Sequence, residues 1–285
     1  MFNFEKQQER METRLLLDRA HERAQREIAS AGIKPDKFRD LYGEEAVDRD
    51  LAYVADMEER FRRSETQESR EAHKVATVFE GIFYDQAEMS DWLGPDAITI
   101  MPSRYDDIKN GVDTIIETRH EGGAASHFGV AIDVTSGIDL DKKFERIMDE
   151  IRAGKLSRVK YFKSDHMKFR GELSRLPRIV IGASGKTVTE LAELWLEKDN
   201  KALASHPVQF QILEEMELQF SAFKAFAKKV NQPDIAAIYS QALLAIRKII
   251  EEKKGSLKDN GDRDEVFESI KSWMKNFKDD DYHRV

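Results

Sequence analysis

The chain contains no cysteine among its 285 residues. This absence excludes disulfides, thiolate metal sites, iron–sulfur clusters and cysteine nucleophiles. Apolar runs are short as well, and none approaches the roughly 20 residues that a membrane-spanning helix needs. The first residues, MFNFEKQQER, lack the basic and then apolar pattern of a secretory signal. We therefore expect a cytoplasmic protein with no membrane partner, in which any metal site uses oxygen or histidine ligands.

Charge is abundant and unevenly placed. The chain has 46 lysines and arginines against 54 aspartates and glutamates, a net charge of −8. This balance argues against bulk attraction to nucleic acid, but residues 155–178 are strongly basic and interleaved with aromatic residues. The stretch fits a nucleic-acid groove and, equally well, a solvated strand edge protected by its lysines. If it is a groove, the contacts are expected from Lys155, Arg158, Lys163, Lys168 and Arg170.

Hydrophobic periodicity divides the chain into three regions. Residues 1–72 form a helical arm, residues 73–200 alternate between helices and short strands, and residues 201–285 are again helical. The middle region predicts an α/β fold, a small mixed β-sheet flanked by helices. Its strands are expected at 97–101, 111–118, 127–135, 158–163 and 178–182, and its helices at 73–92, 139–152 and 187–197.

The two flanking regions favour helices. The arm predicts helices over 2–31 and 44–63, a pattern that fits either a solvated hairpin or an arm that joins copies into a homo-oligomer. In the last region, phenylalanines 210, 220, 223 and 226 recur at helical spacing, which is typical of a buried core.

Two aspartates occupy unusual positions in the strand-rich block. Asp113 lies near the start of one predicted strand, and Asp133 lies between Ile132 and Val134 in another. Burying a carboxylate in an apolar strand costs several kcal/mol unless it is paired or metal-bound. Two carboxylates on adjacent strands would suit Mg²⁺ or Mn²⁺. The structural alternative is that Asp113 caps the turn after Asn110 and Asp133 bonds a neighbouring loop.

Residues 73–200 resemble the PD-(D/E)XK nuclease superfamily, which cleaves phosphodiester bonds with a divalent metal. The resemblance implies an α-β-β-β-α-β, restriction-endonuclease-like core in which Asp113 is the first acid and Asp133 the second. It also implies a further acid at Glu80 in the preceding helix.

The lysine of that motif is replaced by Thr135. A lysine would then come from another element, and Lys142, Lys143 and Lys160 are the candidates. Without one, the same fold would serve as a catalytically inactive binding or assembly protein.

Two other patterns do not predict a ligand site. The segment IGASGKT at 181–187 resembles a phosphate-binding loop but lacks the first glycine of that motif, so we interpret it as a strand-to-helix turn with Thr187 or Thr189 as N-cap. The seven histidines show no HExxH or i, i+4 ligand pair, which makes a zinc site unexpected.

Overall fold

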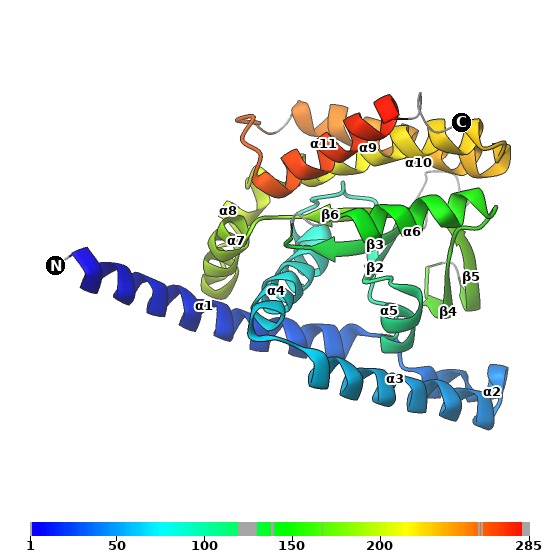
Figure 1. Ribbon diagram of the computed structural model, residues 1–285, viewed down its shortest axis with the longest axis horizontal. Helices are drawn as coiled ribbons and strands as arrows, with labels where there is room; N and C mark the ends of the chain where they lie inside the picture. The colour runs from blue at the N-terminus through cyan, green and yellow to red at the C-terminus, as the bar shows by residue number, and fades with distance from the viewer. Residues whose placement is uncertain are drawn as a thin grey trace.

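The computed structural model describes residues 2–118, 130–137, 140–166, 168–255, 257 and 259–280. This part of the chain is a mixed α/β protein in which small sheets are flanked by helices (Figure 1), as the sequence predicts. The strands are β1 (Ala97–Ile100), β2 (Thr114–Thr118), β3 (Val130–Thr135), β4 (Ser157–Ser164), β5 (Phe169–Leu176) and β6 (Arg178–Gly182).

Helices make up most of the described structure. In chain order they are α1 (Phe2–Ala31), the 3₁₀ helix η1 (Pro35–Phe38), α2 (Arg39–Tyr42), α3 (Glu44–Ser64), α4 (Gln67–Met89), α5 (Arg104–Asn110), α6 (Asp141–Arg152), α7 (Gly185–Glu197), α8 (Asn200–Ala204), α9 (Val208–Lys229), α10 (Pro233–Lys254) and α11 (Glu265–Asp280). None of them combines the length and the apolar character that crossing a membrane requires.

The strands form two sheets. The larger has the order β1-β2-β3-β6, with antiparallel pairs except for β3 and β6, which are parallel. The predicted antiparallel pairing of β2 with β3 is confirmed, while their connecting loop, which includes Gly122–Ser126, lies outside the described residues. Strands β4 and β5 form a separate antiparallel hairpin between α6 and β6.

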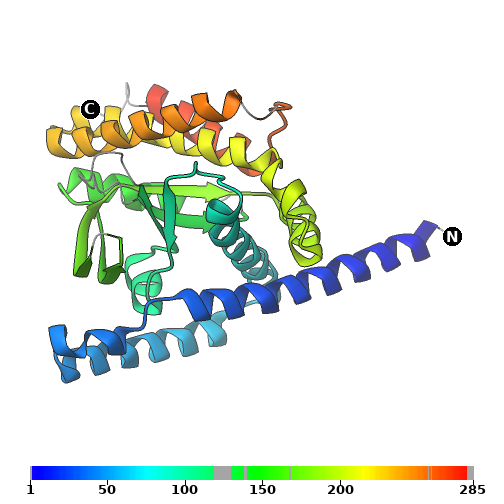
Figure 2. The same ribbon diagram turned by 180° about the vertical axis from the view of Figure 1, so that it is seen from behind.

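Helix α1 joins the arm to the body. It packs against α4 and α7, and its Ala20 and Ala24 are fully buried. At Gly81 of α4 a side-chain carbon would lie 2.8 Å from the Cβ of Ala24, so glycine allows the two helices to approach closely. The first turns of α1 project beyond the body (Figures 1 and 2), where Met11 and Leu15 are exposed. That the arm joins copies of the chain remains a prediction.

One hydrophobic core connects the three regions of the sequence. It includes Ala24 of α1, Ile132 of β3 and Phe220 of α9. The predicted burial of the phenylalanine stripe is confirmed, because Phe210, Phe220, Phe223 and Phe226 are at most 4% exposed. The arm, through α4 and α7, and the C-terminal helices, through α9 on β6, therefore share one core with the sheet.

Side chains of α9 complete the outer edge of β6. Gln219 accepts a hydrogen bond from the amide of Val180 (2.8 Å) and donates one to its carbonyl (2.6 Å). Glu215 accepts from the amide of Gly182 (2.9 Å), and Gln211 donates to the Gly182 carbonyl (3.0 Å). An open sheet edge invites pairing with other chains. Gln211, Glu215 and Gln219 recur every four residues and so share one face of α9, and their side chains take the place of a neighbouring strand along β6.

Glu215 makes the stability of this edge dependent on pH. Its burial raises its pKa well above 4.5. The folded state therefore binds this proton more tightly than the unfolded chain, and the contribution of Glu215 to stability falls as pH rises from 4.5 through the folded pKa. We expect Glu215→Gln to make the free energy of unfolding in urea depend less on pH over that range. Glu251→Gln, at an exposed position of α10, is the control and should leave the wild-type slope.

Candidate functional site

Asp113 is held against strand β3. Helix α5 ends at Asn110, Gly111 caps it in the left-handed conformation, and Asp113 follows two residues later. The Asp113 amide donates to the Ile132 carbonyl (2.8 Å), and the Asp113 carboxylate accepts from the Val134 amide (2.7 Å). Asp113 thus extends the contact between β2 and β3 beyond the last paired residues of the ladder.

Asp133 lies next to Asp113 in the sheet register. The antiparallel β2–β3 pairing has Thr114 opposite Ile132, so one position further along Asp113, which precedes Thr114, comes opposite Asp133, which follows Ile132. On its other side Asp133 is paired with Val180 of β6. The Asp133 side chain lies outside the part of the structure that is described, and the separation of the two carboxylates remains a prediction.

The three candidate lysines occupy different places. Lys143 of α6 donates from Nζ to the Val134 carbonyl (3.1 Å), next to the amide that Asp113 binds. Lys142 is exposed on the same helix. Lys160 lies on the separate β4–β5 hairpin and forms an ion pair with Asp50. The structure therefore brings Lys143, rather than Lys142 or Lys160, to the strand that carries Asp133.

Glu80 comes from the helix on the other side of the sheet from Thr135. Helix α4 covers the face of Thr99, whose hydroxyl contacts the Tyr84 carbonyl at 3.3 Å. Thr99 shares that face with Ile116 and, by register and alternation, with Ile132 and Val134. Thr135 lies on the opposite face. The half-buried Glu80 therefore belongs to a helix that covers the face opposite to Thr135, whereas Lys143 belongs to α6.

The basic residues in the β4–β5 hairpin and just before it fall into two groups. Arg170 donates to the Lys37 carbonyl (3.0 Å) and pairs with Asp40, while Lys163 pairs with Asp165 (2.8 Å). The remaining three candidates are exposed and form no ion pair with the described residues; these are Lys155, Arg158 and Lys168. Lys168 also has a left-handed backbone, with φ of 49°. Three cations therefore remain available to an anionic partner.

Asp106 is a buried carboxylate whose role the sequence analysis missed. It is fully buried and accepts from the Lys160 amide (2.7 Å), the Tyr161 amide (3.0 Å), Ser103 Oγ (2.6 Å) and Asn110 Nδ2 (2.7 Å). Burial raises the pKa of Asp106, although the four donors favour its charged form. The available signal was Ser103-x-x-Asp106, a capping-box spacing at the start of α5.

Tyrosines surround the Lys160 ammonium where the hairpin meets the arm. Its Nζ lies 5.1 Å, 5.5 Å and 5.2 Å from the ring centroids of Tyr42, Tyr105 and Tyr161. The Tyr161 hydroxyl donates to Asp50 (2.7 Å), and the Tyr42 hydroxyl donates to the Lys160 carbonyl (2.8 Å). These contacts join β4 to α2, α3 and α5, which gives Lys160 a structural role here.

The loop before α7 is a strand-to-helix turn, as expected, but its N-cap is Ser184 rather than Thr187 or Thr189. Ser184 Oγ accepts from the Thr187 amide (3.2 Å). The carboxylate of Asp264 accepts from the Ser184 amide (2.6 Å) and from the Thr187 hydroxyl (2.8 Å). A protein carboxylate thus occupies the start of α7, where a phosphate-binding loop would hold its ligand.

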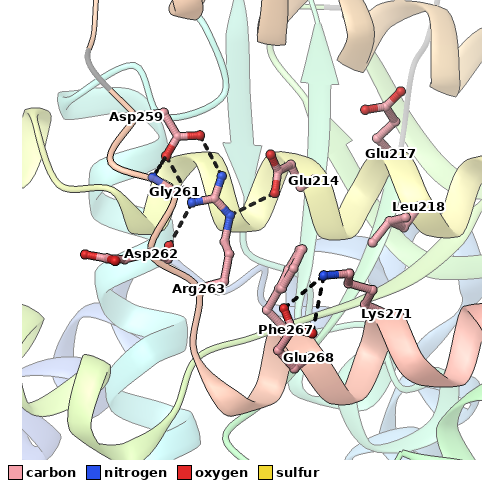
Figure 3. A pocket seen from close by; sticks show the side chains of 10 residues that line it. All are labelled: Glu214, Glu217, Leu218, Asp259, Gly261, Asp262, Arg263, Phe267, Glu268 and Lys271. Carbon is pink, nitrogen blue, oxygen red and sulfur yellow. Dashed lines mark hydrogen bonds and ion pairs between the residues drawn. The ribbon is translucent and has the colours of Figure 1, made fainter.

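A pocket of about 670 Å³ lies between α9, α11 and the loop that joins α10 to α11 (Figure 3). Arg263 crosses it and pairs with Glu214 (2.8 Å) and Asp259 (2.7 Å), and Lys271 pairs with Glu268 (3.1 Å). Because its cationic side chains are paired within the pocket, we assign no ligand to it.

Within the described ranges, no group of three or more histidine, aspartate or glutamate side chains is arranged to hold a metal ion. No protein-family model, no curated protein sequence and no solved structure matches this chain. The features that bear on function are therefore the residues around β2 and β3 and the exposed cations near the hairpin.

Proposed function

We propose that this protein is a metal-dependent nuclease that uses Mg²⁺ or Mn²⁺ to cleave phosphodiester bonds of nucleic acid. The observation that carries the proposal is the position of Asp113 directly before β2, hydrogen-bonded to β3 at Val134, the residue next to Asp133. The order α4-β1-β2-β3-α6-β6 supports it, because it matches the α-β-β-β-α-β order of the nuclease superfamily that the sequence resembles. Helix α5 and the β4–β5 hairpin are insertions in this order.

The donor set suits the metal in its chemistry. Asp113 and Asp133 would hold the ion, since hard divalent cations prefer carboxylate oxygens. When bound, such an ion lowers the pKa of a water molecule and stabilises phosphate oxygens. Lys143 would add positive charge beside β3, the contribution that the missing strand lysine would otherwise make. The exposed Lys155, Arg158 and Lys168 would hold the phosphate backbone.

A second candidate is a nucleic-acid-binding protein that keeps this fold without cleavage. Two observations favour it. Thr135 stands in the lysine position, is buried and accepts from the Gly137 amide (3.2 Å). The Asp113 carboxylate already serves as an acceptor for the Val134 amide. In this candidate Asp113 is a structural residue of the sheet, and binding depends on the cations of the hairpin.

The cleavage prediction concerns Asp113 and Asp133. With Mg²⁺ or Mn²⁺ we expect cleavage of DNA or RNA that a chelator abolishes. Asp113→Asn and Asp133→Asn should each lower its rate about a hundred-fold, since the bound metal supplies several kcal/mol. Gel assays of single- and double-stranded substrates measure the rate. Asp107→Asn, at a partly exposed carboxylate of the adjacent α5, is the control. Absence of cleavage, or activity that survives Asp133→Asn, contradicts the nuclease proposal.

The binding prediction applies to both candidates. Reversing the charge of Lys155, Arg158 and Lys168 to glutamate should weaken binding of single-stranded DNA and reduce the slope of its salt dependence. The slope of the logarithm of the binding constant against the logarithm of the salt concentration should shrink by about 0.7 for each phosphate contact removed. Fluorescence anisotropy over a range of salt concentrations measures both quantities. The same reversal at Lys201, Lys228 and Lys248, which are exposed on α8, α9 and α10, is the control. Equal losses in the two variants would show that net charge, not the hairpin, determines binding.

A further inference from the structure

Two arginines hold the turn that precedes Asp113. Arg178, at the start of β6, is 2% exposed, and its guanidinium donates to the carbonyls of both Asn110 and Gly111. Arg146 of α6 donates from Nη2 to the same Asn110 carbonyl (2.7 Å). These carbonyls lie at the C-terminus of α5, where a helix carries partial negative charge and lacks internal donors. Both arginines thus bind where a cation is favourable.

The buried guanidinium of Arg178 is satisfied on its other edges. Its Nε donates to Ser157 Oγ (2.8 Å), and Nη2 lies 3.4 Å from Glu150, which is also 3.5 Å from Arg146. A planar guanidinium reaches several acceptors with fixed geometry, which a lysine ammonium on a flexible stem does not. Arg178 therefore connects β4, β6, α6 and the end of α5 in one network.

Gly111 fits this arrangement for two reasons. Its backbone is left-handed, with φ of 62°, a conformation that other residues adopt at a cost. A side-chain carbon on Gly111 would also lie 2.4 Å from Nη1 of Arg146 and 3.0 Å from Nη1 of Arg178. The turn and the two guanidinium groups are thus fitted to each other, and two residues later the chain presents Asp113 to β3.

We infer that Arg178 and Arg146 are positioning residues, which fix the Asn110–Gly111 turn and so hold the Asp113 carboxylate on the Val134 amide. In its last step, that this placement prepares Asp113 for a metal ion, the inference rests on the proposed function. The arginines themselves would touch neither metal nor substrate. They act through the backbone of the turn.

The test replaces Arg178 by lysine, which keeps the charge but loses the fork. A charge-assisted hydrogen bond changes an equilibrium constant by a factor of about ten or more. We therefore expect exchange of the Val134 amide proton with solvent to become about ten-fold faster. Mn²⁺ affinity should fall by a similar factor. Exchange measured by NMR reports the placement of Asp113 whether or not the protein is an enzyme, and calorimetry reports the metal.

Arg263→Lys is the matched control. Arg263 is likewise a buried arginine bonded to several acceptors, with 8% of its side chain exposed, but it lies in the α10–α11 loop (Figure 3). It should leave Val134 exchange and Mn²⁺ affinity unchanged. If Arg178→Lys does not fold, Arg146→Met tests the same role, at a side chain that is 44% exposed. It should show the same changes in Val134 exchange and Mn²⁺ affinity, but smaller ones.

The outcomes separate the two proposals. Val134 exchange that is unchanged in the folded variants, or that rises equally in Arg263→Lys, overturns the positioning role. Faster exchange at Val134 in a protein that never binds Mn²⁺ supports the positioning role and removes the metal from the proposed function.

Discussion

Replacing Asp106 by alanine is expected to destabilise the protein by about 3–5 kcal/mol, because buried hydrogen-bond donors left without an acceptor cost about 1–3 kcal/mol each. Four donors reach this carboxylate, and two of them are the backbone amides of Lys160 and Tyr161, which cannot turn towards water. Urea unfolding followed by circular dichroism measures the change. Asp106→Asn keeps one acceptor oxygen and should lose about half as much.

The neighbouring Asp107 is the matched control for this prediction. Its carboxylate is 31% exposed and pairs with Arg104 at the surface. Exposed ion pairs contribute at most about 1 kcal/mol, so Asp107→Ala should change stability little. A small loss in Asp106→Ala, or equal losses in the two variants, would show that the contact between α5 and β4 is not important for stability.

Replacing Gln219 by leucine is expected to destabilise the protein by about 3 kcal/mol, since it leaves both polar groups of Val180 unpaired in the interior. Gln219 is fully buried, and leucine has a similar size, so the loss reports the hydrogen bonds more than the packing. Because the β6 edge then lacks its cover, we also expect the variant to aggregate more readily during thermal unfolding. Chemical denaturation and light scattering measure the two effects.

Gln241→Leu makes the same chemical change at an exposed position of α10. It should alter the unfolding free energy by no more than about 0.5 kcal/mol, as is usual for surface substitutions. If the buried and the exposed variants lose the same amount, the side chain of Gln219 does not replace a neighbouring strand in the way we infer.

Long helices and the pairing of β2 with β3 were accessible from the sequence. The helices predicted over 2–31, 44–63 and 139–152 correspond to α1, α3 and α6 within two residues at each end. In α6, the apolar residues Phe144, Ile147 and Ile151 recur on one face and are buried. Where one face meets the core, the pattern of the side chains follows the period of the backbone, so the element can be recognised without knowing its neighbours.

Short elements with weak patterns were not predicted. Helix α5 has seven residues, too few to show a stripe, and is stabilised by Asp106 contacts to residues more than 50 positions away. Strand β5, FRGELSRL, is mostly exposed, with only Gly171 and Leu176 buried, and so lacks the alternation of a half-buried strand. Helix α5 depends on the Asp106 contacts with β4, and β5 depends on pairing with β4. The local sequence does not contain this information.

The site shows the same division between local and long-range information. The sequence determined that any metal here binds to oxygen or histidine, because cysteine is absent, and it pointed to Asp113 and Asp133 as neighbours. Only the tertiary structure decided that Lys143 reaches β3 while Lys160 is held among tyrosines. The reason is physical: composition and periodicity are properties of single segments, whereas the partner of a side chain depends on which segments pack together and on which face each one presents.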